Sequence, residues 1–238
     1  GQVFPENARV IDKLQGAGAI LTAKLAMIEL AGGTGYERAT ASLTGPCLNP
    51  WDRTRWAGGS SSGSAAAIAS GCVPFALGSE TCGSILNPSA YCGVTGFKPT
   101  FGTLPLQGVL QFSKSLDTLG LFTNTPAGML RLWEALGLST AGQDAGDIVF
   151  GVDPLPKVDP EMAKALGEAV ERLLPVVEVV GVLIDMPHVG DILFLQVGMD
   201  ILADANQAVL VAAGQVEELE QAGRLLGVRH QFGGRDRD

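Results

Sequence analysis

The sequence contains few of the residues that build most metal sites and imidazole-based active sites. Its 238 residues include 2 histidines, His188 and His230, and no H-E-x-x-H motif. The 4 cysteines show no C-x-x-C spacing and have no histidine-rich neighbourhood. These absences argue against a metal centre and against catalysis by a histidine-dependent serine nucleophile.

Positive charge is also scarce. The chain has 16 Lys and Arg residues against 25 Asp and Glu residues, which gives a formal net charge of -9. No basic stripe is present, so direct binding to nucleic-acid phosphates or to an anionic membrane surface is disfavoured. The uncharged run Trp56–Ser79 is long enough to span a bilayer, but it is rich in Gly and Ser and contains Pro74. We therefore expect neither nucleic acid nor a membrane as a partner.

The first residues lack the marks of a targeting signal. Gly1–Glu6 contain neither a basic segment nor an apolar stretch, so no signal peptide is visible. The chain also lacks an initiating Met, which makes it a candidate piece of something longer. We interpret the cysteines as free thiols, because a chain of this length has no need of disulfides. Together these features predict a cytoplasmic location.

Glycine, in contrast, is abundant at 32 residues. This is roughly 13% of the chain against an average of about 7%, which implies many positions where a side chain would interfere. The stretch Gly32–Gly63 is dense in Gly, Thr, Ser and Asn and reads as irregular. A long irregular stretch inside a compact pattern is more often functional than not.

The periodicity of apolar residues predicts helices and strands in alternation, which is typical of an α/β fold. In the helix expected after Asp159-Pro160, a buried stripe would include Met162, Leu166 and Leu173. The expected elements are helices over 6–17, 64–70, about 159–173 and much of 191–227, and strands over 19–23, 73–77 and 176–184.

Two segments carry candidate chemistry, Gly58–Ala67 and Gly78–Pro88. The first is not a phosphate-binding P-loop, because Ser64 stands where that motif needs lysine. Gly59–Gly63 fits the G-x-S-x-G nucleophile elbow, but a turn-rich segment precedes it instead of a strand. Taken alone, the first segment is also compatible with a flexible Ser/Gly linker.

Taken together, the two segments resemble the amidase signature family, serine hydrolases that use a Ser–cis-Ser–Lys triad. The resemblance covers residues 5–125 well and extends weakly to about 187. It implies an α/β fold with a mixed sheet flanked by helices, formed by one domain over 1–238 that is shortened at both ends relative to the family. Further matching segments are Gly18–Leu25, Asn49–Asp52, Ser89–Thr100 and Ser115–Gly120.

The resemblance assigns roles residue by residue. Ser84 matches the acylated nucleophile, and Ser60 matches the bridging serine whose preceding peptide is cis in the family. Ser61 supports that loop. The remaining assignments are backbone N–H groups of an oxyanion hole at Thr81, Cys82, Gly83 and Ser84, and a substrate-side segment at Gly32, Gly33 and Thr34.

The chain also departs from the family pattern. The catalytic lysine of the family precedes the bridging serine by more than the 59 residues available here, and Lys24 matches a different, non-catalytic lysine. Cys82 stands where Gly or Ser is common, and we interpret it as a buried small residue. Leu86 and Asn87 occupy the region where many members carry a substrate-binding arginine, which favours a neutral or apolar substrate.

The favoured hypothesis is a serine amidohydrolase that cleaves a carboxylic amide, ester or carbamate through an acyl-enzyme on Ser84. The resemblance implies no metal and no organic cofactor, and a small molecule as the substrate. One alternative is a catalytically disabled module that binds or scaffolds without the lysine base. Another is the amidase subunit of a tRNA-dependent amidotransferase, with the RNA left to a partner protein.

Overall fold

The computed structural model describes residues 4–32, 40–138, 149–152, 159–173, 178–181 and 209–212. The chain divides into two compact units, one of residues 1–139 and 189–215, the other of residues 140–188 and 216–238. Gly33 and Thr34, which we expected on the substrate side, lie outside the described residues.

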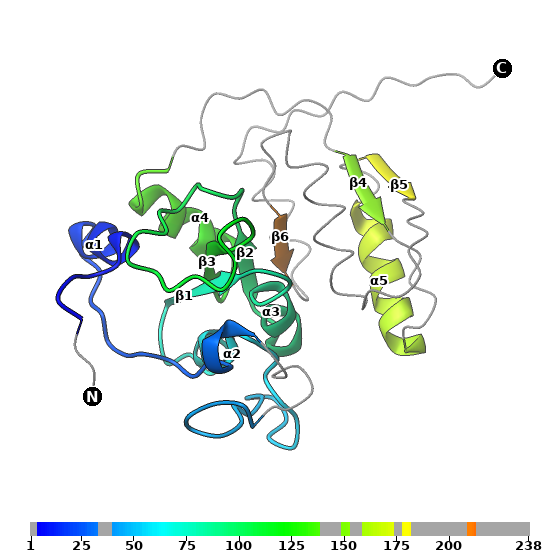
Figure 1. Cartoon of the computed structure of the whole chain (residues 1–238). Coiled ribbons are helices and arrows are strands. Elements are labelled where there is room, and N and C mark those ends of the chain that lie inside the picture. The colour runs from blue at the N-terminus through cyan, green and yellow to red at the C-terminus, as the bar shows by residue number, and fades with distance from the viewer. Residues whose placement is uncertain are drawn as a thin grey trace. The chain divides into compact units, whose positions relative to one another are not determined.

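The first unit is built around a sheet of strand order β1-β3-β2-β6, in which neighbouring strands are antiparallel (Figure 1). The central strand β3 pairs Leu121 with Leu77 of β1 and with Phe97 of β2. The elements of this unit are α1 (Arg9–Gly16), η1 (Glu29–Ala31), α2 (Ser62–Ala69), β1 (Phe75–Glu80), α3 (Leu86–Cys92), β2 (Thr95–Lys98), β3 (Thr118–Thr123), α4 (Pro126–Ala135) and β6 (Val209–Ala212).

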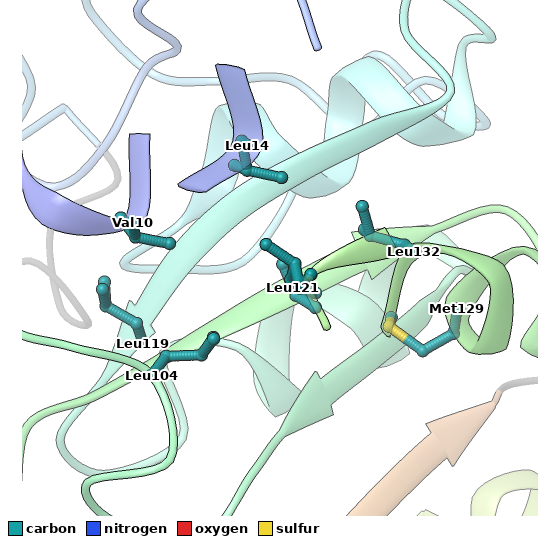
Figure 2. Close-up of a cluster of buried hydrophobic side chains, with 8 residues drawn as sticks. Val10, Leu14, Leu104, Leu119, Leu121, Met129 and Leu132 are labelled. Carbon is teal, nitrogen blue, oxygen red and sulfur yellow. The ribbon is translucent and has the colours of Figure 1, made fainter. Parts of the chain in front are cut away.

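Alternating residues of β3 supply two hydrophobic clusters, because successive side chains of a strand point to opposite faces. Figure 2 shows the first cluster, where Leu121 lies among side chains from α1 and α4. On the other face, Phe122 packs in a second cluster with Ile68 of α2 and Ile85 just before α3. Helices α2 and α3 therefore share one face of the sheet, and the serine-rich segments precede these two helices.

The second unit is described through β4 (Val149–Val152), α5 (Pro160–Leu173) and β5 (Glu178–Gly181), and β4 pairs with β5 in parallel. The predicted helix start is confirmed, since Glu161 N–H donates to Asp159 Oδ1 at 2.9 Å in front of Pro160. The predicted buried stripe is wrong in its first turns, because Met162 is 61% exposed and Leu166 39% exposed.

Most of the other expected elements are confirmed, with small shifts at their ends. Helix α1 lies within 6–17, α2 begins two residues before the expected 64, β1 overlaps 73–77, and β5 lies within 176–184. The α/β class is therefore correct. Within the described residues, the main sheet is antiparallel and the β4–β5 pair is parallel.

Two predictions of secondary structure are wrong. Residues 19–23 form no strand: Ile20 is 83% exposed, and no backbone hydrogen bond among the described residues involves 20–25. A strand needs a paired neighbour, which this segment does not have within the described part of the chain. The helix expected over much of 191–227 is wrong at Val209–Ala212. These residues form β6, which pairs with β2, a strand far away in the sequence, so the local periodicity did not indicate it. The rest of 191–227 lies outside the described residues.

Candidate active site

The first serine-rich loop runs from Gly58 to Ser61 and enters α2. The glycines of this loop and of the first turn of α2 are required by close packing. A Cβ atom at Gly63 would lie 2.7 Å from the backbone oxygen of Ala26, and one at Gly59 would lie 2.8 Å from the Trp56 ring. Real Cβ atoms do not approach other atoms this closely, so part of the glycine surplus serves the contact between this loop and the segment 26–28.

Backbone contacts hold Ser60 from several directions. The Gly59–Ser60 peptide is cis. The carbonyl of Ser60 accepts a hydrogen bond from Ile28 N–H at 3.0 Å, and Gly63 N–H donates to Ala26 carbonyl at 2.8 Å. The side chain of Ser60 is fully buried, and its Oγ has no hydrogen-bond partner among the described residues. A buried hydroxyl without a partner costs free energy, and Thr95 Oγ1 on β2 is the other such atom among the described residues.

Ser61 and Ser64 connect the loop and α2 to strand β1. Ser61 Oγ donates to the carbonyl of Ser79 and accepts from Ser79 N–H, both at 3.3 Å. Ser64 Oγ donates to the carbonyl of Leu77 at 2.6 Å. A Cβ at Gly78 would lie 2.8 Å from Ser61 Oγ, so the strand is glycine where the serine approaches it. These contacts join Ser61 to strand β1, and its role in supporting the site stays a prediction.

The second loop carries Ser84 between the end of β1 and the start of α3. Its Gly83 has a φ of 94°, a left-handed conformation that favours glycine. The carboxylate of Glu80, 1% exposed, accepts hydrogen bonds from Ile85 N–H at 2.7 Å and from Leu86 N–H at 2.9 Å. The side chain of Glu80 thereby closes the loop around Ser84.

Burial raises the pKa of Glu80 above its ordinary value. The N–H groups of Leu86 and Ile85, the charge of Lys98 and the N–H of Gly83 act in the opposite direction, because each favours the ionised carboxylate. Lys98 is itself buried, on β2. The loop that bears Ser84 is therefore held by a carboxyl group whose ionised form is disfavoured by burial.

A second buried carboxylate holds the other end of this loop. Thr81 Oγ1 donates to Asp117 Oδ1, and Asp117 Oδ2 accepts from Phe112 N–H at 2.6 Å and Ser113 N–H at 3.0 Å. Asp117 is 5% exposed, so this is an interior connection. It ties the predicted oxyanion residue Thr81 to the turn before β3.

The two serine loops meet directly. Ser61 N–H donates to the carbonyl of Ser84 at 3.2 Å, which places the Ser60 peptide beside the second loop. Gly59 N–H donates to Asn87 Oδ1 at 3.0 Å, from the other side of Ser60. Ser84 is 3% exposed. The structure thus brings the predicted pair of serines together in an interior setting with a hydroxyl that still needs a partner.

The structure also places three other residues that were named from the sequence, Cys82, Lys24 and Gly32. The pKa of the Cys82 thiol is raised, first by burial and then by the charge of Glu80, which disfavours a thiolate nucleophile. Lys24 is exposed, and its Nζ lies 5.9 Å from the centre of the Phe4 ring. Gly32 lies against the Phe112 ring, where a Cβ would be 2.9 Å from Cε2.

The roles of Glu80, Asn87 and Asp117 as anchors of the loops were not expected from the sequence, although each residue lies within or beside a quoted motif. The described residues include no group of three or more His, Cys, Asp or Glu side chains able to hold a metal. None of the helices in the described segments has the length and apolar character needed to cross a membrane. All four cysteines carry free thiols.

An α/β domain that joins two serine loops at the starts of neighbouring helices has the layout of a paired-serine site. The sequence profile of the amidase family matches residues 1–168, and the chain belongs to this family. The expected family resemblance is confirmed.

Several curated relatives are named as one of the subunits of glutamyl-tRNA(Gln) amidotransferase. The protein of Treponema denticola is 48% identical over 148 residues, which is 62% of this chain and 29% of that protein. The protein of Geobacillus kaustophilus is 36% identical over 94% of this chain and 41% of its own length. The chain therefore spans less than half the length of these relatives.

Solved structures agree with the family. A crystal structure of an amidase has a TM-score of 0.65 and 39% identity, and the match covers 76% of this chain and 42% of that one. The corresponding glutamyl-tRNA(Gln) amidotransferase chain of Thermotoga maritima has a TM-score of 0.64 and 25% identity, with 92% of this chain and 56% of that one covered.

Proposed function

We propose that the protein is a serine amidohydrolase in which Ser84 is the nucleophile and Ser60 carries the proton. Ser84 Oγ attacks the carbonyl carbon of an amide, its proton passes to Ser60, and the C–N bond breaks as the nitrogen receives a proton through Ser60. Water then attacks the acyl–Ser84 ester and releases the acid. The same steps serve an ester or a carbamate.

One observation carries this proposal, namely the hydrogen bond from Ser61 N–H to the carbonyl of Ser84. It fixes the peptide that bears Ser60 against the loop that bears Ser84, and the buried Ser60 hydroxyl makes no other bond among the described residues. A hydroxyl that relays a proton must be able to exchange donor and acceptor roles, and an unpartnered hydroxyl can do so.

The proton that Ser60 receives needs an acceptor. In the family this acceptor is a lysine, and Ser60 Oγ contacts no lysine amine within the described part of the chain. Lys24 is engaged over Phe4 and stands exposed. We infer that the general base is an amine and that it belongs to none of the residues that contact Ser60 in the described part of the chain.

The developing negative charge on the substrate oxygen needs hydrogen-bond donors. The backbone N–H groups of Thr81, Cys82 and Ser84 remain our candidates for this oxyanion hole, whereas the N–H of Gly83, also expected there, is directed to the Glu80 carboxylate. Glu80 and Asp117 hold the two ends of that loop, so its N–H groups are fixed before a substrate binds. Losing one such donor typically costs about 3 kcal/mol of transition-state stabilisation.

A fluorophosphonate probe tests the assignment, because it labels activated serines. We expect one adduct by intact mass spectrometry, mapped to Ser84, and none on the Ser84→Ala variant. Ser70→Ala is the matched control, since within the described residues Ser70 Oγ bonds to its own helix end and to Cys72, away from both serine loops. Labelling that persists in Ser84→Ala, or a wild-type chain that is not labelled, would reject the proposal. The second outcome would favour a binding or scaffolding module.

A second candidate is the amidase subunit of a tRNA-dependent amidotransferase. The names of the curated relatives favour it, at 48% identity over 62% of this chain for one of them. In that case, the small amide would be glutamine and the ammonia would be passed to a partner. Co-purification with a second, more basic protein, together with release of ammonia from glutamine, would support this function. Hydrolysis of simple amides without any such partner would contradict it.

A further inference from the structure

Asn87 holds the first serine loop from the side opposite Ser84. It stands near the start of α3, in the region where many members of the amidase family carry a substrate-binding arginine. In the structure, its side chain is turned inward, and Oδ1 accepts the hydrogen bond from Gly59 N–H. Its own N–H donates to the carbonyl of Gly83 at 2.7 Å. Asn87 therefore contacts the residue before Ser60 and the residue before Ser84.

The packing around this contact is tight. Gly58 has a φ of 81°, and a Cβ there would lie 2.7 Å from Asn87 Oδ1 and 2.8 Å from Pro88 Cα. The backbone of the first loop thus rests directly on the start of α3. Asn87 Oδ1 accepts from a donor that would otherwise be a partly buried, unsatisfied N–H group, which raises the cost of losing the contact.

The other tethers of the Ser60 peptide are made by backbone atoms. Ile28 N–H donates to the carbonyl of Ser60, and Ser61 N–H donates to the carbonyl of Ser84. Neither depends on the identity of a side chain. The contact on Gly59 N–H, in contrast, exists only because residue 87 carries an acceptor of the right length.

We propose that Asn87 is a positioning residue that fixes the Ser60 hydroxyl for proton transfer to and from Ser84. This inference rests on the proposed function. The Oδ1 acceptor is committed to Gly59, so this oxygen is not available to a substrate. An aspartate has a comparable acceptor at the same distance from the backbone, whereas a leucine has similar volume and none.

The test measures the rate constant for fluorophosphonate labelling of Ser84, and kcat and KM for a neutral aryl amide or ester. We expect Asn87→Leu to lower the labelling rate constant and kcat at least about 10-fold, with KM within about 2-fold. Asn87→Asp should recover most of the loss. A general loss of structure would not lower kcat while leaving KM unchanged, and aspartate would not reverse it.

Asn49→Leu is the matched control. Asn49 makes comparable contacts, donating to the Tyr91 carbonyl at 2.7 Å and accepting from Trp51 N–H at 2.9 Å, but neither of these hydrogen bonds reaches a serine loop. Its folded fraction should label at the wild-type rate. Wild-type labelling in Asn87→Leu, a change in KM alone, or no rescue by aspartate would overturn the inference while the proposed function stands. A wild-type chain without labelling would overturn both.

Discussion

The two serine loops are held in opposite ways. The Ser60 loop is fixed mainly by backbone hydrogen bonds and by glycines that let the chain pack against Ala26 and Trp56. The Ser84 loop is fixed by two buried carboxylates, Glu80 and Asp117. The first arrangement is sensitive to volume and insensitive to pH, and the second is sensitive to charge. Substitutions should therefore separate the two loops.

The loops also differ in how well their polar groups are satisfied. In the Ser84 loop, the carboxylate oxygens of Asp117 and one oxygen of Glu80 have hydrogen-bond donors. In the Ser60 loop, the central hydroxyl has none among the described residues. Buried polar groups in proteins are nearly always paired, and among the described residues Ser60 Oγ and Thr95 Oγ1 are the two buried side-chain atoms without a partner. Only Ser60 lies beside a second serine loop, and under the proposed function its hydroxyl gains a partner during proton transfer.

The largest effect is expected for Gly63→Ala, which tests the close packing at the point where the Ser60 loop enters α2. The added methyl group meets the backbone of Ala26, which cannot rotate away as a side chain can. We expect the free energy of unfolding to fall by about 3 kcal/mol, measured by urea denaturation. Gly16→Ala is the control, since nothing lies within 4 Å of a Cβ there. Equal stability of the two variants would show that the loop is not close-packed.

A somewhat smaller effect is expected for Asp117→Ala, which removes one anchor of the Ser84 loop. The Thr81 hydroxyl and the N–H groups of Phe112 and Ser113 would lose their acceptor. We expect a loss of about 2 kcal/mol in urea denaturation, and a smaller loss for Asp117→Asn, which keeps one acceptor oxygen. If alanine and asparagine cost the same, the hydrogen bonds are not what anchors the loop.

The smallest expected effect is the pH dependence that Glu80 gives to the free energy of unfolding. Because burial raises the pKa of Glu80 in the folded protein, the folded state holds this proton more tightly than the unfolded chain does. Its contribution to stability is therefore complete below the unfolded pKa and is lost as pH rises through the folded pKa. Glutamine keeps an acceptor for Ile85 and Leu86 N–H but has no proton to lose.

The stability of Glu80→Gln relative to wild type should accordingly improve as pH rises from about 4 to about 8. Urea denaturation of both proteins across this range gives the difference directly, and other titrating groups cancel in it. A difference that is constant, or that declines with rising pH, would mean that the carboxylate is better stabilised than its burial indicates.

Local patterns predicted the elements whose stabilising contacts are local. Asp159 and Pro160 marked the start of α5 because capping involves neighbouring residues. The paired serines were also found, because a family motif covers both loops. Val209–Ala212 was assigned wrongly, since its strand character comes from pairing with β2 across the chain.

The anchoring contacts of the site could not be predicted for the same reason. Asn87 donates to Gly83 nearby, but its side chain reaches Gly59, and Thr81 finds its acceptor at Asp117. A sequence shows that these side chains can accept hydrogen bonds and does not show which donor they meet. Among the described residues, Ser60 Oγ has no hydrogen-bond partner, and this too is visible only in the folded chain.

Under the proposed function, the Ser60 hydroxyl serves proton transfer, and its burial without a partner lowers the stability of the fold. The most direct test measures Ser60→Ala twice, once by urea denaturation and once by the rate of fluorophosphonate labelling at Ser84. We predict that removing the unpartnered hydroxyl raises the free energy of unfolding by about 1 kcal/mol and slows labelling at least about 100-fold. A variant that is less stable than wild type, or that labels Ser84 at the wild-type rate, would contradict the account.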